Sequence, residues 1–193
     1  LRLAVITTAK YVVPRLLGSF CQHYPGIDVT LKVTNHQEIQ RRMLENEDDL
    51  YIVSNPPEDI DLHSKQFLDN PLVVVAKADH PLAKQHNISI DALNDQPFIM
   101  REKGSGTRIA VLNLFAKYKV SVNVKLELGS NEAIKQAIAG GFGISGLSEH
   151  CLISQGISGE LTVLDVEHFP IERYWYVSYL AGKKLSVIAQ TFI

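Results

Sequence analysis

Polar residues at the beginnings of predicted helices are the best candidates for chemistry in this sequence. Four groups of hydroxyl or amide residues each follow a predicted strand: Thr7-Thr8, Asn35-His36-Gln37, Ser105-Gly106-Thr107 and Ser130-Asn131. A helix N-terminus offers free backbone N–H groups and a partial positive charge, and both favour an anion. Helix capping alone explains any one group, so a functional interpretation requires several of them to meet at one place.

The segment from Arg101 to Arg108 has the richest combination of residue types, with the sequence R-E-K-G-S-G-T-R. Its glycines allow close backbone approach, its hydroxyls donate hydrogen bonds, and its cations suit a carboxylate or a phosphate. The candidate ligand residues from this segment are Lys103, Ser105, Gly106, Thr107 and Arg108. The alternative is a solvated basic turn. A P-loop is excluded because the Gly-Lys-Ser/Thr ending is missing.

The run Gly141-Phe142-Gly143-Ile144-Ser145-Gly146 matches the dinucleotide pattern G-x-G-x-x-G. That fingerprint requires a strand before the glycines and a helix after them. Here a predicted helix precedes the run and a predicted strand follows it. We therefore interpret the run as a helix C-terminus followed by a tight turn, and expect no nucleotide.

Groupings typical of catalysis or metal binding are missing from the sequence. None of the seven histidines has a partner four residues away, and neither Cys21 nor Cys151 belongs to a C-x-x-C motif. The acidic pairs Asp48-Asp49 and Glu58-Asp59 lie in polar turns, where solvated surface carboxylates are common. We predict no enzymatic activity, no metal and no cofactor. The two cysteines are expected to be buried thiols, and a disulfide between them stays open.

The composition is that of an ordinary globular chain of 193 residues, with 19 Lys+Arg against 21 Asp+Glu and a net charge of −2. Nucleic-acid binders usually carry a basic excess, so we do not expect these residues to bind DNA. No apolar run reaches the roughly 20 residues that a membrane-spanning helix needs. No signal peptide is visible and the first residue is not Met, which predicts a cytoplasmic fragment of a longer protein.

Strands and helices are expected to alternate in two stretches of the chain. Residues 1–54 have the pattern strand, helix, strand, helix, strand, and a second alternating stretch begins at Phe98. This alternation predicts an α/β fold with parallel sheets and right-handed crossovers. In the predicted helix 107–119, the spacing places Ile109, Leu112, Phe115 and Ala116 on the inward face.

The order of several motifs resembles the effector-binding domain of LysR-type transcriptional regulators over almost the whole chain. The motifs are Pro14-Arg15-Leu16-Leu17, Tyr24-Pro25-Gly26-Ile27, Leu72-Val73-Val74-Val75-Ala76, His80-Pro81-Leu82 and Gly140-Gly141-Phe142-Gly143-Ile144. The segment 101–108 and the later Leu147-Ser148-Glu149-His150 look most like the CbbR- and CmpR-like subgroup. That subgroup controls carbon dioxide fixation and inorganic-carbon uptake.

The resemblance implies two Rossmann-like lobes joined by two crossover strands, as in type II periplasmic binding proteins. Residues 1–70 plus 169–193 would form the first lobe, and residues 71–168 the second. A small anionic carbon metabolite of the phosphoglycolate, ribulose bisphosphate or 2-oxoglutarate class would bind between the lobes. The implied effector residues are Thr7, Thr8, Asn35, Gln37, Ser105, Thr107 and Ser130, and Asn131 joins them as a residue of the same helix start.

The same resemblance implies that DNA binding belongs to a winged helix-turn-helix domain outside this sequence, and that the domain forms a homodimer or homotetramer. Helices 13–24 and 107–119 would supply the subunit contacts. Closure on the effector would then be transmitted to the DNA-binding heads. The main alternative is a periplasmic-type solute-binding protein of a transporter, and a second is an enzyme acting on a phosphorylated substrate.

Overall fold

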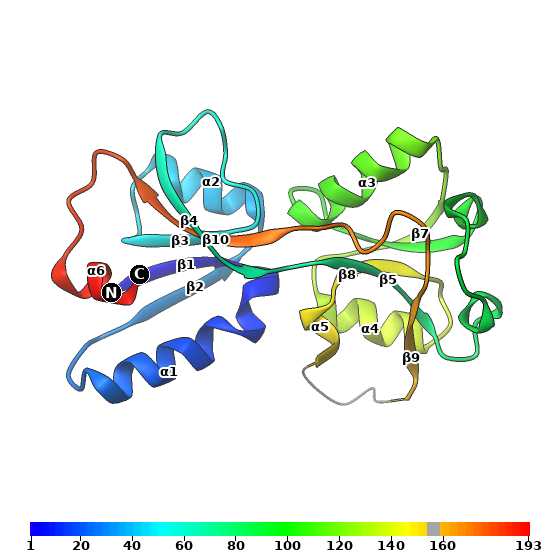
Figure 1. Ribbon diagram of the computed structural model, residues 1–193, viewed down its shortest axis with the longest axis horizontal. Helices are drawn as coiled ribbons and strands as arrows, with labels where there is room; N and C mark the ends of the chain where they lie inside the picture. Colours follow the sequence, from blue (N-terminus) through cyan, green and yellow to red (C-terminus); the bar gives the residue numbers. More distant parts are fainter. Residues whose placement is uncertain (154–158) are drawn as a thin grey trace. The chain divides into compact units, whose positions relative to one another are not determined.

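The structure is a computed structural model that describes residues 1–153 and 159–193. It divides into two compact units (Figure 1). Unit 1 contains Leu1–Asn70 and Tyr174–Ile193, and unit 2 contains Pro71–Arg173. The chain therefore passes from one unit to the other at Asn70–Pro71 and returns at Arg173–Tyr174.

Unit 1 is built on a five-stranded mixed sheet with the strand order β2-β1-β3-β10-β4. Its strands are β1 (Arg2–Ile6), β2 (Thr30–Thr34), β3 (Leu50–Val53), β4 (Leu62–Asp69) and β10 (Tyr174–Leu180). Strand β1 pairs in parallel with β2 and β3, whereas β10 is antiparallel to both β3 and β4. The predicted strand-helix alternation of residues 1–54 is confirmed. Strand β10 comes from the C-terminal part of the chain and makes the antiparallel pairs of the sheet.

Helices cover both faces of this sheet. Unit 1 contains the 3-10 helix η1 (Thr7–Tyr11) and the α-helices α1 (Val13–His23), α2 (His36–Leu44) and α6 (Val187–Phe192). Helices α1 and α2 lie on opposite faces of the strands (Figure 1). Pro14 lies in the first turn of α1, where its missing N–H leaves no intrahelical bond unmade. The inward residues Val13 and Leu17 pack against the fully buried centres of β1 and β3.

The segment after β1 is the 3-10 helix η1 (Thr7–Tyr11), whose N-cap Ile6 makes no side-chain capping bond. Thr8 and Ala9 are buried in this turn. The Trp175 indole nitrogen Nε1 lies 3.4 Å from the Thr8 hydroxyl oxygen and donates to it. Thr8 is therefore packed in the interior, and neither threonine caps α1, whose N-cap is Val12.

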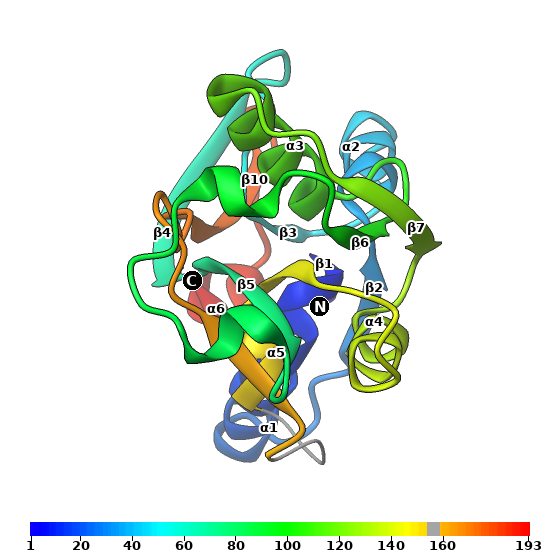
Figure 2. The ribbon, with the colours of Figure 1, turned by 90° about the vertical axis from the view of Figure 1, so that its right-hand side faces the viewer.

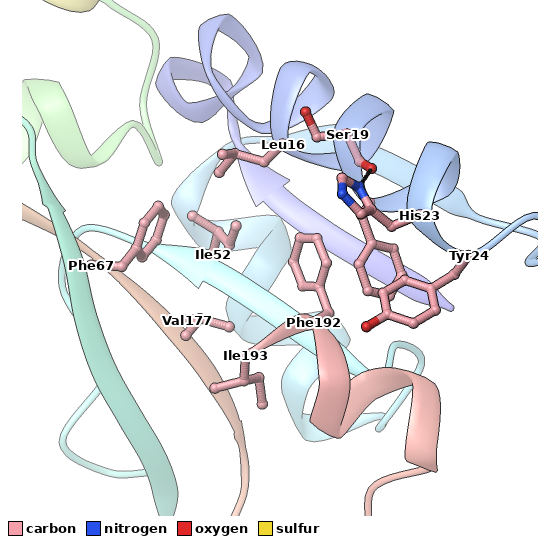
Figure 3. A pocket seen from close by; sticks show the side chains of 10 residues that line it. Leu16, Ser19, His23, Tyr24, Ile52, Phe67, Val177, Phe192 and Ile193 are labelled. Atoms are coloured by element: carbon pink, nitrogen blue, oxygen red, sulfur yellow. Dashed lines mark hydrogen bonds between the residues drawn. The ribbon is translucent and has the colours of Figure 1, made fainter.

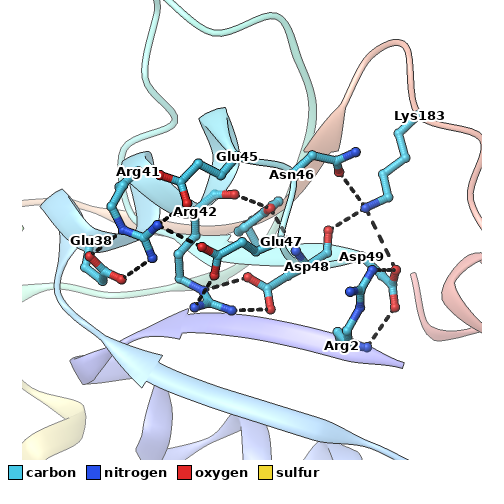
Figure 4. Close-up of polar contacts among 11 residues, drawn as sticks. Arg2, Glu38, Arg41, Arg42, Glu45, Asn46, Glu47, Asp48, Asp49 and Lys183 are labelled. Atoms are coloured by element: carbon cyan, nitrogen blue, oxygen red, sulfur yellow. Dashed lines mark hydrogen bonds and ion pairs between the residues drawn. The ribbon is translucent and has the colours of Figure 1, made fainter.

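A polar network ties α2 to the following loop and to the C-terminal segment (Figure 4). The Arg42 guanidinium donates to both carboxylate oxygens of the buried Asp48, at 2.8 and 2.9 Å. The Lys183 ammonium donates to the Asn46 side chain at 2.8 Å and to the Asp48 carbonyl oxygen at 2.5 Å. The charges in this part of the chain are therefore engaged in structural contacts.

Unit 2 contains two smaller sheets. Strands β5 (Leu72–Lys77), β8 (Ser145–Ser148) and β9 (Leu161–Leu164) form an antiparallel sheet with the order β8-β5-β9. Strands β6 (Pro97–Arg101) and β7 (Asn123–Leu128) form a parallel pair. The two sheets are linked where the N–H of Ile99 donates to the Ile144 carbonyl oxygen at 2.8 Å.

The helices of unit 2 are α3 (Gly106–Tyr118), α4 (Asn131–Ala139) and the short α5 (His150–Ile153), with 3-10 turns η2 (Pro81–Lys84) and η3 (Ile90–Leu93). Helices α3 and α4 lie on opposite sides of β6 and β7 (Figures 1 and 2). Two apolar clusters fill the space beneath them, one including Phe98 and Phe115 and the other Ile99 and Ile134.

The predicted inward face of α3 is confirmed for Phe115 and is wrong for Ile109, Leu112 and Ala116. Ile109 and Leu112 are 46% and 41% exposed, whereas Thr107, Val111 and Phe115 are buried. Apolar residues occupy almost the whole circumference of this helix, so their spacing does not identify one face. Val111 fills the space beside Gly146, where an added Cβ atom would lie 2.6 Å from the Val111 Cγ2 atom.

The glycine run 141–146 forms a helix end and a turn, as predicted. Gly141 has a φ of 80° and Gly143 a φ of 146°, both in the region that favours glycine. A Cβ atom on Gly143 would lie 2.2 Å from the Pro97 carbonyl oxygen. Gly143 therefore allows the turn after α4 to approach the backbone at Pro97 closely.

Residues 169–173 group with unit 2, although the resemblance assigned them to the first lobe. Ile171 exchanges two backbone hydrogen bonds with Leu72, at 3.0 and 2.9 Å. Phe169 and Ile171 also pack against the larger apolar cluster of unit 2. These backbone hydrogen bonds to β5 thus attach residues 169–173 to unit 2.

Candidate functional site

The parallel strands of unit 1 end at one polar edge. Ile6 and Thr34 are register partners at the ends of β1 and β2, so Thr7 and Asn35 follow at the same edge. Ser54, which follows β3, is buried there, and the Asn70 amide donates to its hydroxyl at 2.8 Å. The carboxyl ends of parallel strands are where open α/β sheets usually bind ligands. The structure thus brings Thr7, Thr8 and Asn35 together as one candidate group.

The predicted helix starts are also genuine caps. The Asn35 side chain accepts the Glu38 N–H at 3.0 Å, and the Ser105 hydroxyl accepts the Arg108 N–H at 3.5 Å. The Ser130 hydroxyl accepts the Ala133 N–H at 3.4 Å. These contacts satisfy helix donors whether or not a ligand is present. Gln37, the second residue of α2, is exposed.

Unit 2 has a second polar edge, formed where β6 and β7 end. Arg101 and Leu128 are register partners, and the Glu102 N–H donates to the Leu128 carbonyl oxygen at 3.2 Å. This pairing places the loop that leads to Ser105 beside the loop that leads to Ser130. Two helix N-termini, those of α3 and α4, therefore begin at the same edge, with Gly106, Thr107 and Asn131 in their first turns.

A buried guanidinium organises this edge. Arg101 is 2% exposed, and its Nε and Nη2 atoms donate to the two carboxylate oxygens of Glu102 at 2.8 and 3.0 Å. Its Nη1 atom donates to the Asn131 Oδ1 atom at 2.7 Å. Asn131 is also 2% exposed, and its Nδ2 atom has no hydrogen-bond partner among the described residues. A buried amide with an unmade bond is uncommon and marks this position as a candidate ligand contact.

Arg108 and Lys103 differ in how their charge is used. The Arg108 guanidinium donates to the Arg101 carbonyl oxygen at 2.7 Å and to a Glu127 carboxylate oxygen at 2.6 Å. The hydrogen bond from Arg108 holds the pKa of Glu127 below its usual range. The charge of Arg108 is thus balanced within the protein, whereas Lys103 is exposed on the loop.

Arg173 was not among the residues predicted to bind an effector, although its surroundings set it apart. It is half-buried at the return crossover and forms no hydrogen bond or ion pair with any residue that the structure describes. Burial lowers the pKa of its guanidinium to about 10, so the side chain remains cationic at neutral pH. No short sequence motif surrounds Arg173, so only the three-dimensional structure reveals it.

An apolar cavity of about 360 Å³ lies within unit 1 and is a poor place for an anion (Figure 3). It is lined by Leu16, Ser19, Phe20, His23, Tyr24, Ile52, Phe67, Val177, Phe192 and Ile193. The rings of Phe20 and Phe192 meet edge to face, with centroids 5.2 Å apart. None of the predicted effector residues lines this cavity, and we do not assign the effector to it.

The described residues contain neither a cluster of metal ligands nor a membrane-spanning helix. In residues 1–153 and 159–193, no group of three or more His, Cys, Asp or Glu side chains is placed to hold a metal ion. In the same part of the chain, no helix has both the length and the hydropathy to cross a membrane. Within the described residues neither Cys21 nor Cys151 forms a disulfide; Cys151 is buried and Cys21 is half-buried.

Comparison with known proteins gives one consistent result. The family model described as the LysR substrate binding domain matches residues 1–193. The chain is 53% identical to the HTH-type transcriptional activator CmpR of Synechocystis sp. and 45% identical to a RuBisCO operon transcriptional regulator of Acidithiobacillus ferrooxidans. Each match covers the whole chain but only 64% and 62% of those relatives. These relatives are transcriptional regulators, neither enzymes nor transporter components.

The solved structures agree. The regulatory domain of CcmR from Synechocystis PCC6803 in complex with 2-PG shares 70% of its residues with this chain, with a TM-score of 0.97. That match covers all of this chain and 92% of the other. The effector-binding domain of QuiR in complex with shikimate has a TM-score of 0.84 at 22% identity, which supports the fold alone. The predicted fold class and family are both confirmed.

Proposed function

Because the chain belongs to the LysR substrate-binding domain family, we propose that it senses a small anionic carbon metabolite, with 2-phosphoglycolate as the first candidate. The observation that supports an anion most directly is the pair of unsatisfied donors in unit 2. The Nδ2 atom of Asn131 lacks a partner, and the Arg173 guanidinium lacks a counter-ion among the described residues. A ligand rich in acceptor oxygens would satisfy both kinds of donor.

The chemistry of 2-phosphoglycolate matches these donors. It carries a carboxylate and a phosphate, and at neutral pH its anionic oxygens act as acceptors. Helix N-termini bind such groups through backbone N–H atoms and the helix dipole. The edge of unit 2 supplies two helix N-termini of this kind, those of α3 and α4, beside the hydroxyls of Ser105 and Ser130.

We propose that residues of both polar edges contribute to effector binding. The residues in unit 1 are Thr7, Thr8, Asn35 and Gln37. Those in unit 2 are Lys103, Ser105, Gly106, Thr107, Ser130 and Asn131. We add Arg173 because its half-buried guanidinium has no counter-ion among the described residues. Arg108 has a supporting role in this proposal, because Glu127 already balances its charge.

The effector would act by a population shift. A ligand can move an equilibrium between two states only by binding one of them more tightly than the other. The whole protein would carry a DNA-binding domain outside this sequence and would control genes for carbon fixation or carbon uptake in the cytoplasm. The names of the longer relatives support this assignment.

Exposed apolar side chains support self-association. Ile109 and Leu112 lie three residues apart on the open face of α3, and Val124 on the following strand is 48% exposed. In unit 1, Leu16 is 44% exposed and Val33 is 37% exposed. Exposed apolar patches on a globular domain usually mark an interaction site. We propose that these residues contact a second copy of the chain in a homodimer or homotetramer.

Isothermal titration calorimetry tests the effector assignment. The purified domain would be titrated with 2-phosphoglycolate, ribulose 1,5-bisphosphate and 2-oxoglutarate, with glucose as an uncharged control. We expect at least one anion to bind with a Kd well below millimolar and glucose to give no signal. Millimolar or weaker binding by all three anions would refute the proposed function.

A further inference from the structure

The feature of interest is the amide of Asn131, the first residue of α4. Its Oδ1 atom accepts from Arg101 Nη1 at 2.7 Å, and a guanidinium nitrogen can only donate. Rotating the amide by 180° would therefore place two donors against each other. The contact with Arg101 fixes the amide orientation, so Nδ2 must be the atom without a partner.

Arg101 is itself held in place. Two parallel hydrogen bonds join its guanidinium to the Glu102 carboxylate, a fork geometry that restricts both side chains. The guanidinium is buried and carries a positive charge. The ion pair with Glu102 also balances the charge of the guanidinium that contacts Asn131. The Nδ2 group of Asn131, at the N-terminus of α4, is then the hydrogen-bond donor left for an incoming ligand.

We infer that Arg101 and Glu102 are positioning residues that commit the Asn131 amide to donate to an anionic oxygen of the effector. The inference rests on the proposed function, because it names the contact that selects an acceptor over a donor at the same site. A carboxylate or phosphate oxygen would complete the unmade hydrogen bond of Nδ2. A hydroxyl could do so only as an acceptor, and an ammonium group could not do so at all.

The substitution Asn131→Asp separates this role from folding. The carboxylate has nearly the same shape and still accepts from Arg101, with a charge-assisted bond in place of a neutral one. Its second oxygen replaces the donor and repels an anion. We expect the melting temperature to stay the same or rise, while the Kd for 2-phosphoglycolate increases at least tenfold. Asn123→Asp makes the same charge change at an exposed position of unit 2 and should change the Kd less than twofold.

A double-mutant cycle tests the positioning role of Arg101. Lys at this position keeps the charge but loses the fork that orients the amide. If Arg101 acts through Asn131, then Arg101→Lys weakens binding severalfold in the wild-type background and has little further effect in Asn131→Asp. An equal loss of affinity in both backgrounds would show that Arg101 has only a structural role and would overturn the positioning inference.

The outcomes for the inference and for the proposed function are distinguishable. If the wild-type domain binds 2-phosphoglycolate and Asn131→Asp binds it equally well, the inference fails and the proposed function stands. The side-chain amide resonances of Asn131 give a second readout, to be followed by nuclear magnetic resonance during titration with 2-phosphoglycolate and with inorganic phosphate. A shift on binding supports the contact. If calorimetry shows no binding and these resonances do not move, both proposals are refuted.

Discussion

Tyr51 and Arg42 are joined by a hydrogen bond in which the Tyr51 hydroxyl donates to the Arg42 carbonyl oxygen at 2.9 Å. The same hydroxyl accepts the Asp48 N–H at 3.1 Å. It therefore closes the last turn of α2 and the loop that leads back into β3. A tyrosine is unusual inside a buried strand, and these two bonds explain why this one is fully buried.

Tyr51→Phe removes both hydrogen bonds without changing the packing. The Asp48 N–H and the Arg42 carbonyl oxygen lose this partner, and we expect a loss of about 1–3 kcal/mol in the free energy of unfolding. Urea denaturation measures it. Tyr24→Phe, at a side chain that is 44% exposed, is the matched control and should change the stability by less than about 0.5 kcal/mol. Equal stabilities of the two variants would contradict this account of Tyr51.

The acid dependence of stability should depend on Asp49. Burial raises the pKa of Asp49, but the hydrogen bonds from Arg2 and the charges of Arg2 and Lys183 outweigh burial, so the net pKa is lowered. A lowered folded-state pKa stabilises the protein above the unfolded value of about 4, and this contribution is lost as the pH falls through the folded value. We expect Asp49→Asn to be less stable than wild type by about 1 kcal/mol at pH 7.

Urea denaturation between pH 7 and pH 3 tests the Asp49 prediction. The stability difference between wild type and Asp49→Asn should shrink as the pH falls below about 4, because the wild-type carboxylate then becomes protonated. Asp59→Asn, at an exposed loop position, serves as the control and should leave the pH profile unchanged. A stability difference that stays constant over the whole range would rule out the ionic contribution of Asp49.

Gly143→Ala should be strongly destabilising. The backbone of Gly143 has a φ of 146°, and an added Cβ would lie 2.2 Å from the Pro97 carbonyl oxygen. We expect a loss of at least about 2 kcal/mol from backbone strain and steric overlap together. Gly182→Ala is the control, because an added Cβ there meets no atom within 4 Å. Similar melting temperatures for the two variants would contradict the close approach at Pro97.

Self-association should depend on the open face of α3. Leu112→Asp places a charge on the exposed apolar surface that Leu112 shares with Ile109, and we expect the sedimentation coefficient to fall toward that of a monomer. Phe142→Asp introduces the same charge at a 57% exposed position on the turn after α4 and should leave the assembly unchanged. If Leu112→Asp sediments like the wild type, α3 is not the subunit contact.

The parts of the fold that the sequence predicts are local. Asn35, Ser105 and Ser130 could be identified as caps because a cap and its helix are contiguous in sequence. The turn at Gly141 followed from the same kind of local pattern. Most of the inward face of α3 could not be predicted, since apolar residues surround the helix and the contact between Val111 and Gly146 joins residues far apart in the sequence.

The main feature of the candidate site depends on contacts between distant residues. Arg101 and Asn131 are 30 positions apart and meet only because β6 and β7 pair in one particular register. The sequence showed that both side chains were polar and lay near helix starts. It did not show that Glu102 would engage Arg101, or that Glu127 would balance Arg108. Pairing between such residues is a tertiary property, and it decides which donors remain for a ligand.

Arg173→Gln should improve stability while weakening effector binding. A half-buried guanidinium without a counter-ion among the described residues costs free energy, as its pKa of about 10 shows. A neutral side chain removes that cost, so we expect the melting temperature of the ligand-free protein to stay the same or rise. An anionic effector would lose a charge-assisted contact, so its Kd should increase at least tenfold, as measured by calorimetry. Arg15→Gln, at an exposed position of α1, should alter neither quantity. A fall in melting temperature with unchanged affinity would mean that Arg173 supports the fold and does not bind the effector.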